Sequence, residues 1–216
     1  TRYKDRYSYD GNVNGGFSKR TTGETTDPDY TEKLEWNINV NHHQKFTPTM
    51  QLDARLQFLS NDYLNLNSPN LQDRVQNDIT SNATLSKRWD GAGTNLTVNY
   101  NRTQNLETGN INEDLPSLTF TKNVAYPFRS SSAQGKSMDW YEYIGYSYTG
   151  KFRNNRSKIG DESKIHGGFD HRVSIQASPK LGYFNLSPSF NISSKWYNKK
   201  QIQEIDSEID SSGTPQ

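Results

Sequence analysis

Histidines and carboxylates are the residues that could do chemistry in this chain, but their spacing does not assemble a reactive set. The pair His42-His43 lies in a predicted turn with no third ligand nearby, so a solvated turn is favoured over a metal site. His166 and His171 flank the start of a predicted strand, and no recognisable nucleophile motif accompanies them. Asp90-Gly91-Ala92-Gly93 is typical of a tight hairpin, because no helix follows that could complete a phosphate-binding loop. The sequence therefore predicts no catalytic residue, no metal site and no cofactor.

The composition is polar, yet it differs from that of a disordered chain. Of the 216 residues, 30% are hydrophobic and 12% are aromatic, and 25 basic residues face 24 acidic ones. Disorder goes with few aromatic residues and a large net charge, so an ordered protein is expected. The near-neutral charge argues against a nucleic-acid partner, which usually requires a basic surface. The lack of cysteine excludes disulfide scaffolds and thiol chemistry.

Strict alternation of apolar and polar residues recurs along the chain and determines the expected fold class. It runs through Leu34–Asn41, Met50–Phe58, Asn95–Asn101, Phe169–Ala177 and Phe184–Ile192. A period of two places one set of side chains on one face of a strand and the other set on the opposite face. No segment shows helical spacing of comparable strength. The sequence predicts an all-β protein.

Nine antiparallel strands are expected, joined by turns of different length. They are placed at 3–18, 32–42, 48–60, 81–90, 94–104, 116–123, 138–153, 166–178 and 181–197, the last interrupted by Pro188. Short turns are expected at 42–47, 90–93 and 178–180, and long connections at 19–31, 60–80, 104–115 and 154–165. Residues 124–137 form a long connection where this alternation calls for a short one.

Alternating short and long connections are typical of transmembrane outer-membrane β-barrels. A soluble sheet protein also alternates, so period two alone does not separate the two classes. Several strands are longer than those of most soluble sheets, and aromatic residues such as Phe58, Trp89 and Trp196 gather near strand ends, as at a membrane interface. These features favour a membrane barrel. Because nine is an odd number, residues 1–216 are expected to be part of one larger barrel domain, with 204–216 as a polar loop or tail.

One stretch carries a more specific signal, because several short motifs follow one another in a set order. These motifs are Asp62-Tyr63, Arg74–Trp89, Asn95–Tyr100, Gln104-Asn105, the Leu-Pro-Ser-Leu-Thr-Phe run at 115–120, and Tyr126-Pro127-Phe128. The stretch, about residues 50–130, resembles the barrel domain of the LptD family of lipopolysaccharide-assembly proteins, also called OstA or organic solvent tolerance protein. It is similar in particular to the divergent members of Bacteroidetes-type bacteria. The chain shows no periplasmic jellyroll and no cysteine for the disulfides of some members, as expected of a segment from within the barrel.

The resemblance implies a function in transport without covalent chemistry. Members of this family insert lipopolysaccharide into the outer leaflet of the outer membrane of Gram-negative bacteria, through a polar lumen and a lateral seam. The implied partners are lipopolysaccharide, outer-membrane lipids, a plug lipoprotein and the periplasmic proteins that form a bridge for lipopolysaccharide.

The alternation then assigns side chains to the two expected environments. The polar set, expected to line the lumen, is Asn37, Asn39, Gln51, Asp53, Arg55, Gln57, Thr97 and Asn99. The apolar set, expected to face lipid, is Leu34, Trp36, Ile38, Leu52, Leu56, Leu96 and Val98.

Two other classes remain open from the sequence. One is a TonB-dependent receptor or porin-like barrel that transports a different cargo and carries a plug domain or a constricting loop. The other is a soluble β-rich adhesin or glycan-binding domain, in which the Tyr and Trp side chains serve as binding platforms and which folds without detergent.

Overall fold

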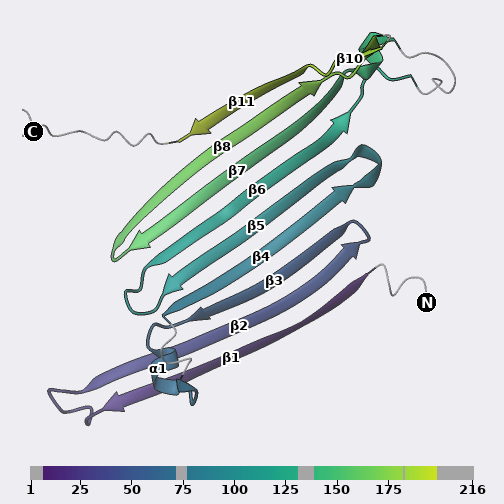
Figure 1. Cartoon of the computed structure of the whole chain (residues 1–216). Helices are drawn as coiled ribbons and strands as arrows, with labels where there is room; N and C mark the ends of the chain where they lie inside the picture. Colours follow the sequence, from purple (N-terminus) through teal and green to yellow (C-terminus); the bar gives the residue numbers. More distant parts are fainter. Residues whose placement is uncertain (1–6, 72–76, 131–138, 182, 199–216) are drawn as a thin grey trace, which may run out of the picture.

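The computed structural model describes residues 7–71, 77–130, 139–181 and 183–198 of the chain. The expected polar loop at 204–216 lies outside these residues. Within them, the fold is a single antiparallel sheet of nine strands in the order β1-β2-β3-β4-β5-β6-β7-β8-β11 (Figure 1). No helix in this part of the chain combines the length and the apolar character needed to cross a membrane.

The nine strands follow the order of the sequence, so nearly every strand pairs with the one that precedes it. They are β1 Ser8–Thr22, β2 Thr31–Thr47, β3 Met50–Leu59, β4 Asp78–Trp89, β5 Thr94–Asn105, β6 Ile111–Ala125, β7 Gly145–Ile159, β8 Glu162–Gln176 and β11 Ser189–Tyr197. A helix, α1 (Tyr63–Asn67), lies between β3 and β4, and the short helical turns η1 (Asp90–Ala92) and η2 (Trp140–Tyr143) precede β5 and β7. The prediction of an all-β, antiparallel chain is confirmed.

The connection between β7 and β8, which the sequence suggested would be long, is a tight turn. The strands β7 and β8 pair without interruption from Gly145↔Gln176 to Ile159↔Glu162, which leaves only Gly160 and Asp161 to reverse the chain. Gly160 adopts a φ of +57°, a conformation that favours glycine. The prediction of a long connection at 154–165 was therefore wrong. It failed because this part of both strands contains only two large apolar residues, Ile159 and Ile165, which lie on opposite faces, so no period of two marks it as a strand.

Several other strand boundaries also differ from those expected. The strand β6 starts at Ile111 and leaves 106–110 as the turn, and β2 continues to Thr47, so that Pro48 and Thr49 form its turn. The seventh strand begins at Gly145 instead of residue 138, because η2 occupies the preceding residues. The hairpin expected at Asp90–Gly93 is confirmed, with Gly93 at a φ of +56°.

The ninth strand is shorter than expected. A separate hairpin of β9 (Lys180–Leu181) and β10 (Phe184–Asn185) precedes it, and the ladder with β8 begins only after Pro188. Proline has no N–H to donate to a ladder. The carbonyl of Pro188 instead accepts a hydrogen bond from Ala177 N at 3.1 Å. The proline thus determines where β11 starts.

The strands β3 and β4 separate towards the α1 end of the sheet. Their ladder runs only from Met50↔Lys87 to Arg55↔Asn82. Beyond it, the fully buried Ser81 hydroxyl accepts from Gln57 N at 2.9 Å and donates to Gln57 O at 2.8 Å. A side chain therefore replaces the backbone pairing where the two strands part.

A small apolar cluster fills this opening. Leu59, Ile79 and Leu106 are 3%, 0% and 8% exposed, and Tyr63 and Leu64 of the α1 helix pack against them. These are the only buried large hydrophobic side chains among the residues described. The sheet has no second layer that packs across it, as Figure 1 shows for the same ranges.

Large apolar side chains consequently remain uncovered over the rest of the sheet. Phe17, Phe190 and Trp196 are 81%, 61% and 67% exposed. A sheet of a water-soluble domain normally buries its apolar side against another layer. This chain leaves that side available for contact with another apolar medium.

Candidate functional site

The pairing register places all eight predicted lumen residues on one side of the sheet, which we call the polar face. Residues directly opposite each other on antiparallel strands point to the same side. Asn39 pairs with Gln57, and Asp53 pairs with Thr84, which in turn pairs with Asn99. By the same register the polar face carries Asn37, Asn39, Gln51, Asp53, Arg55, Gln57, Thr97 and Asn99.

The seven predicted lipid residues lie on the opposite side, the apolar face. Leu52 pairs with Leu85, and Leu85 pairs with Val98, so three neighbouring strands contribute to one apolar row. The set comprises Leu34, Trp36, Ile38, Leu52, Leu56, Leu96 and Val98. That the two faces meet a lumen and lipid remains a prediction.

Aromatic side chains continue the apolar face across the C-terminal strands. The ring centroids of Phe120 and Tyr148 are 6.0 Å apart, those of Phe169 and His171 are 5.3 Å apart, and those of His171 and Trp196 are 6.0 Å apart. His171 thus lies among aromatic rings within β8, and its Nε2 atom is buried without a hydrogen-bond partner in the described ranges. This position suits packing better than proton transfer.

Two glycines make room for tyrosine rings on these strands. A Cβ atom at Gly150 would lie 2.6 Å from the hydroxyl of Tyr148, and one at Gly168 would lie 2.8 Å from Cδ1 of Tyr197. Both distances are too short for a real contact, so the rings occupy the space that a side chain would take. Gly150 lies opposite His171 on the apolar face, and Gly168 lies opposite Tyr197 on the polar face.

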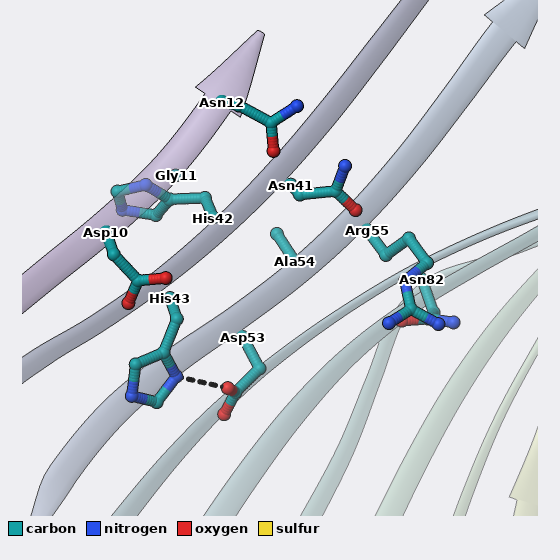
Figure 2. Close-up of a pocket in the computed structure, with 10 residues that line it drawn as sticks. All are labelled: Asp10, Gly11, Asn12, Asn41, His42, His43, Asp53, Ala54, Arg55 and Asn82. Atoms are coloured by element: carbon teal, nitrogen blue, oxygen red, sulfur yellow. Dashed lines mark hydrogen bonds and ion pairs between the residues drawn. The ribbon is translucent and has the colours of Figure 1, made fainter.

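A hollow of about 600 Å³ lies on the polar face over β1 to β4 (Figure 2). Two of the predicted lumen residues, Asp53 and Arg55, line it. His43 Nδ1 contacts Asp53 Oδ1 at 2.5 Å, marked by the dashed line in Figure 2. The prediction that His42-His43 lies in a turn was wrong, because β2 extends past both residues.

Sequence reasoning missed the other polar residues of this hollow. They are Asp10, Asn12, Asn41, His42, His43 and Asn82. Three of them, Asp10, Asn12 and Asn82, come from strands in which the alternation of apolar and polar residues was weak or was not used. Asn41, in contrast, is the last residue of an alternating segment that was recognised. No group of three or more His, Cys, Asp or Glu side chains within the described residues is arranged to hold a metal ion. The amide, imidazole and carboxylate groups that line the hollow are suited to hydrogen bonding with a polar molecule.

Charged side chains lie at both edges of the apolar face, at the two ends of the central strands. At one end, Arg102 and Arg156 contact the carboxylate of Glu113 at 3.2 and 3.7 Å, and the side chains of Arg102 and Glu113 are only 11% and 15% exposed. At the other end, Lys87 Nζ donates to Thr49 Oγ1 at 3.0 Å and Lys122 Nζ donates to Ala92 O.

On β5, the apolar face between these charges consists of Leu96, Val98 and Tyr100. Both lysines direct their ammonium groups to polar atoms of the turns, as long side chains do when they keep their charge away from an apolar surface. The apolar face is thus a band with charged residues at its margins, where Lys87 lies directly opposite Leu96.

The connection between β6 and β7 is held by an acidic turn. The buried carboxylate of Glu142 accepts hydrogen bonds from Asp139 N at 2.8 Å and Ser130 N at 3.0 Å. The hydroxyl of Tyr141 donates to Asp139 Oδ2 at 2.8 Å, and this hydrogen bond raises the pKa of the tyrosine. These contacts fix the turn ahead of Gly145, where β7 begins.

A single antiparallel sheet with one polar face and one uncovered apolar band is the wall of a membrane β-barrel of the outer-membrane type. The described sheet supplies nine neighbouring strands of such a wall. This class of protein accounts for both the missing second layer and the opposite chemistry of the two faces.

Comparison with protein families identifies the family to which the chain belongs. The chain belongs to the LptD family, whose model, described as LptD protein, matches residues 1–215. The resemblance inferred from the motifs is therefore confirmed over nearly the whole chain. No curated protein and no solved structure matches the sequence.

Proposed function

We propose that this chain forms part of the wall of an outer-membrane barrel that places lipopolysaccharide in the outer leaflet of a Gram-negative cell. Membership of the LptD family supports this function at the level of the family. The observation that carries it within the chain is the division of the sheet into a polar face and an apolar band. Inside a bilayer every backbone N–H and C=O must be paired within protein, so a spanning sheet has to close.

The two faces suit the two parts of the cargo. Lipopolysaccharide joins acyl chains to a large sugar head, and the head needs hydrogen-bonding partners while it crosses the apolar layer. The polar face offers such groups along its length, among them Asn37, Asn39, Asp53 and Arg55. The acyl chains leave sideways through a lateral seam between two strands and reach the lipid. The side chains do no covalent chemistry in this scheme.

The proposed partners follow from the same scheme. Lipopolysaccharide is delivered by periplasmic proteins that form a bridge to the barrel, and a lipoprotein plugs the lumen. The outer-membrane lipids contact the apolar band, for which Leu52, Leu56 and Val98 are suitable contacts.

Cysteine labelling at neighbouring positions tests the assignment of the faces. In the protein that carries this chain, Asp53→Cys is expected to react at least about tenfold faster than Leu52→Cys with a water-soluble thiol reagent in lipid vesicles, because only the thiol at 53 reaches water. The 216 residues contain no cysteine of their own that would react. Equal rates at the two positions would contradict the assignment.

Depletion of the protein in its own cells tests the function. Surface lipopolysaccharide, measured with an antibody on intact cells, is expected to fall while lipopolysaccharide accumulates inside. If instead uptake of a nutrient falls and surface lipopolysaccharide stays normal, the chain belongs to a receptor or porin-like transporter. If the protein folds as a monomer in buffer without detergent, it is a soluble sheet protein and the proposed function is wrong.

A further inference from the structure

The segment Ser60–Leu71, which contains α1, folds back over the polar face of β1 and β2. Arg20 of β1 and Lys33 of β2 lie directly opposite each other on that face, and each contacts the segment. Arg20 Nη2 donates to Leu66 O at 2.5 Å, and Lys33 Nζ lies 3.4 Å from Asp62 Oδ2. Figure 1 shows α1 against the ends of these two strands.

The segment shields the polar face beneath it from solvent. The Ser60 hydroxyl donates to the carboxylate of Glu35, which is only 5% exposed. Ser18, which pairs with Glu35, has a buried hydroxyl oxygen. A Cβ atom at Gly16 would lie 3.1 Å from the hydroxyl of Tyr63. Three successive rows of the polar face therefore lie at or under this segment: Gly16↔Asn37, Ser18↔Glu35 and Arg20↔Lys33.

The far side of the segment is fixed as well. Tyr63 and Leu64 pack on the buried cluster of Leu59, Ile79 and Leu106. Gln104 Nε2 donates to Leu59 O at 3.3 Å and to Asn61 Oδ1 at 2.9 Å. Contacts from β1, β2 and β5 therefore hold the segment in one place, and it does not extend away from the sheet as an ordinary surface loop does.

We propose that Ser60–Leu71 is a built-in constriction of the polar face, which limits the size of the solutes that can pass along it. This inference rests on the proposed function, because it requires the polar face to line a lumen. A segment fixed on the inner wall reduces the cross-section that is open to a passing molecule. Its anchors, Arg20, Lys33 and Glu35, thereby become residues that determine size selectivity.

Thiol accessibility in the full-length protein tests whether the segment covers the face. Ser18→Cys lies beneath the segment, and Asn14→Cys, on the same strand and face, lies outside it and is exposed. We expect Ser18→Cys to react about tenfold more slowly than Asn14→Cys with a maleimide. Adding Arg20→Met, Lys33→Met and Ser60→Ala, which remove the anchors, is expected to raise the rate at 18 about tenfold and to leave the rate at 14 unchanged.

Entry of a large hydrophilic antibiotic into cells tests the role in selectivity. The triple variant Arg20→Met/Lys33→Met/Ser60→Ala is expected to lower the inhibitory concentration at least about fourfold, with normal surface lipopolysaccharide. Asp62→Asn removes only a half-exposed ion pair, so this variant is expected to fold and to lower that concentration about twofold. Lys164→Met, which removes a charge far from the segment, is the matched control and is expected to change nothing.

The outcomes separate this inference from the proposed function. If the triple variant or Asp62→Asn is folded and antibiotic entry stays at the level of the unmodified protein, the constriction is refuted, while export of lipopolysaccharide can still proceed. If Ser18→Cys reacts as fast as Asn14→Cys before any anchor is removed, the segment does not cover the polar face and the constriction is equally refuted. Loss of surface lipopolysaccharide on depletion bears on the proposed function alone.

Discussion

Val98→Arg is expected to destabilise the folded protein strongly in a bilayer. Val98 lies in the middle of the apolar band, where it pairs with Leu85 on one side and Leu118 on the other. An arginine facing lipid at the midplane of a bilayer costs about 2–4 kcal/mol. The free energy of unfolding, measured by urea titration in lipid vesicles, should fall by this amount.

Asn99→Arg is the matched control, because it introduces the same side chain one residue further along β5. Asn99 lies on the polar face, where it accepts a hydrogen bond from Thr84 Oγ1 at 2.9 Å. The loss of this hydrogen bond is expected to cost only about 1 kcal/mol. Similar losses in the two variants would contradict the assignment of lipid to one face only.

Glu113→Gln is expected to cause a comparable loss of stability at the margin of the apolar band. Glu113 contacts both Arg102 and Arg156, and its side chain is 15% exposed. Removing one partner of a buried ion pair leaves an uncompensated charge and costs about 3–5 kcal/mol. Because Arg156 is 52% exposed and keeps its water, the loss is expected near the lower end of that range, as measured by urea titration.

Glu162→Gln provides the comparison for this prediction. Its ion pair with Lys164 lies at the tip of the β7–β8 hairpin, and the two side chains are 78% and 65% exposed. Exposed pairs contribute about 0–1 kcal/mol, so the free energy of unfolding should barely change. If Glu162→Gln proves as damaging as Glu113→Gln, burial is not what makes the Glu113 cluster important.

The sequence allowed the wall of the sheet to be predicted where one face is apolar. Leu34–Asn41 and Met50–Phe58 alternate strictly, and both lie within observed strands, β2 and β3, in a register that keeps their apolar residues together. A shift of one residue would move every one of these side chains to the other face, so the pattern alone fixes which residues share a face.

The parts that the sequence did not reveal are those in which neither face is apolar. In β7, residues 153–159 and their partners in β8 contain only two large apolar residues, Ile159 and Ile165, and these lie on opposite faces, so no alternation marks the segment. Only pairing with the neighbouring strand and the turn at Gly160 define them as strands. His43 was missed as a site residue for the same reason, since residues 41–45 of β2 are polar on both faces.

The segment over the polar face could not be predicted, because its contacts join distant parts of the chain. Leu59, Ile79 and Leu106 are spread over more than one hairpin, and Arg20 reaches Leu66 across 46 positions. The apolar residues Tyr63, Leu64 and Leu66 within a largely polar connection were a local sign of a packed element. It does not show by itself on which side of the sheet the helix packs.

The hairpin of β7 and β8 has a practical consequence for determining topology. Near its tip, Arg156 and Lys158 occupy the side that is apolar elsewhere, and Lys164 occupies the other side, so both surfaces are hydrophilic. Such a tip projects beyond the hydrocarbon into water. An epitope tag inserted between Gly160 and Asp161 would therefore be tolerated, and its detection by antibody on intact cells would reveal which end of the strands faces the outside.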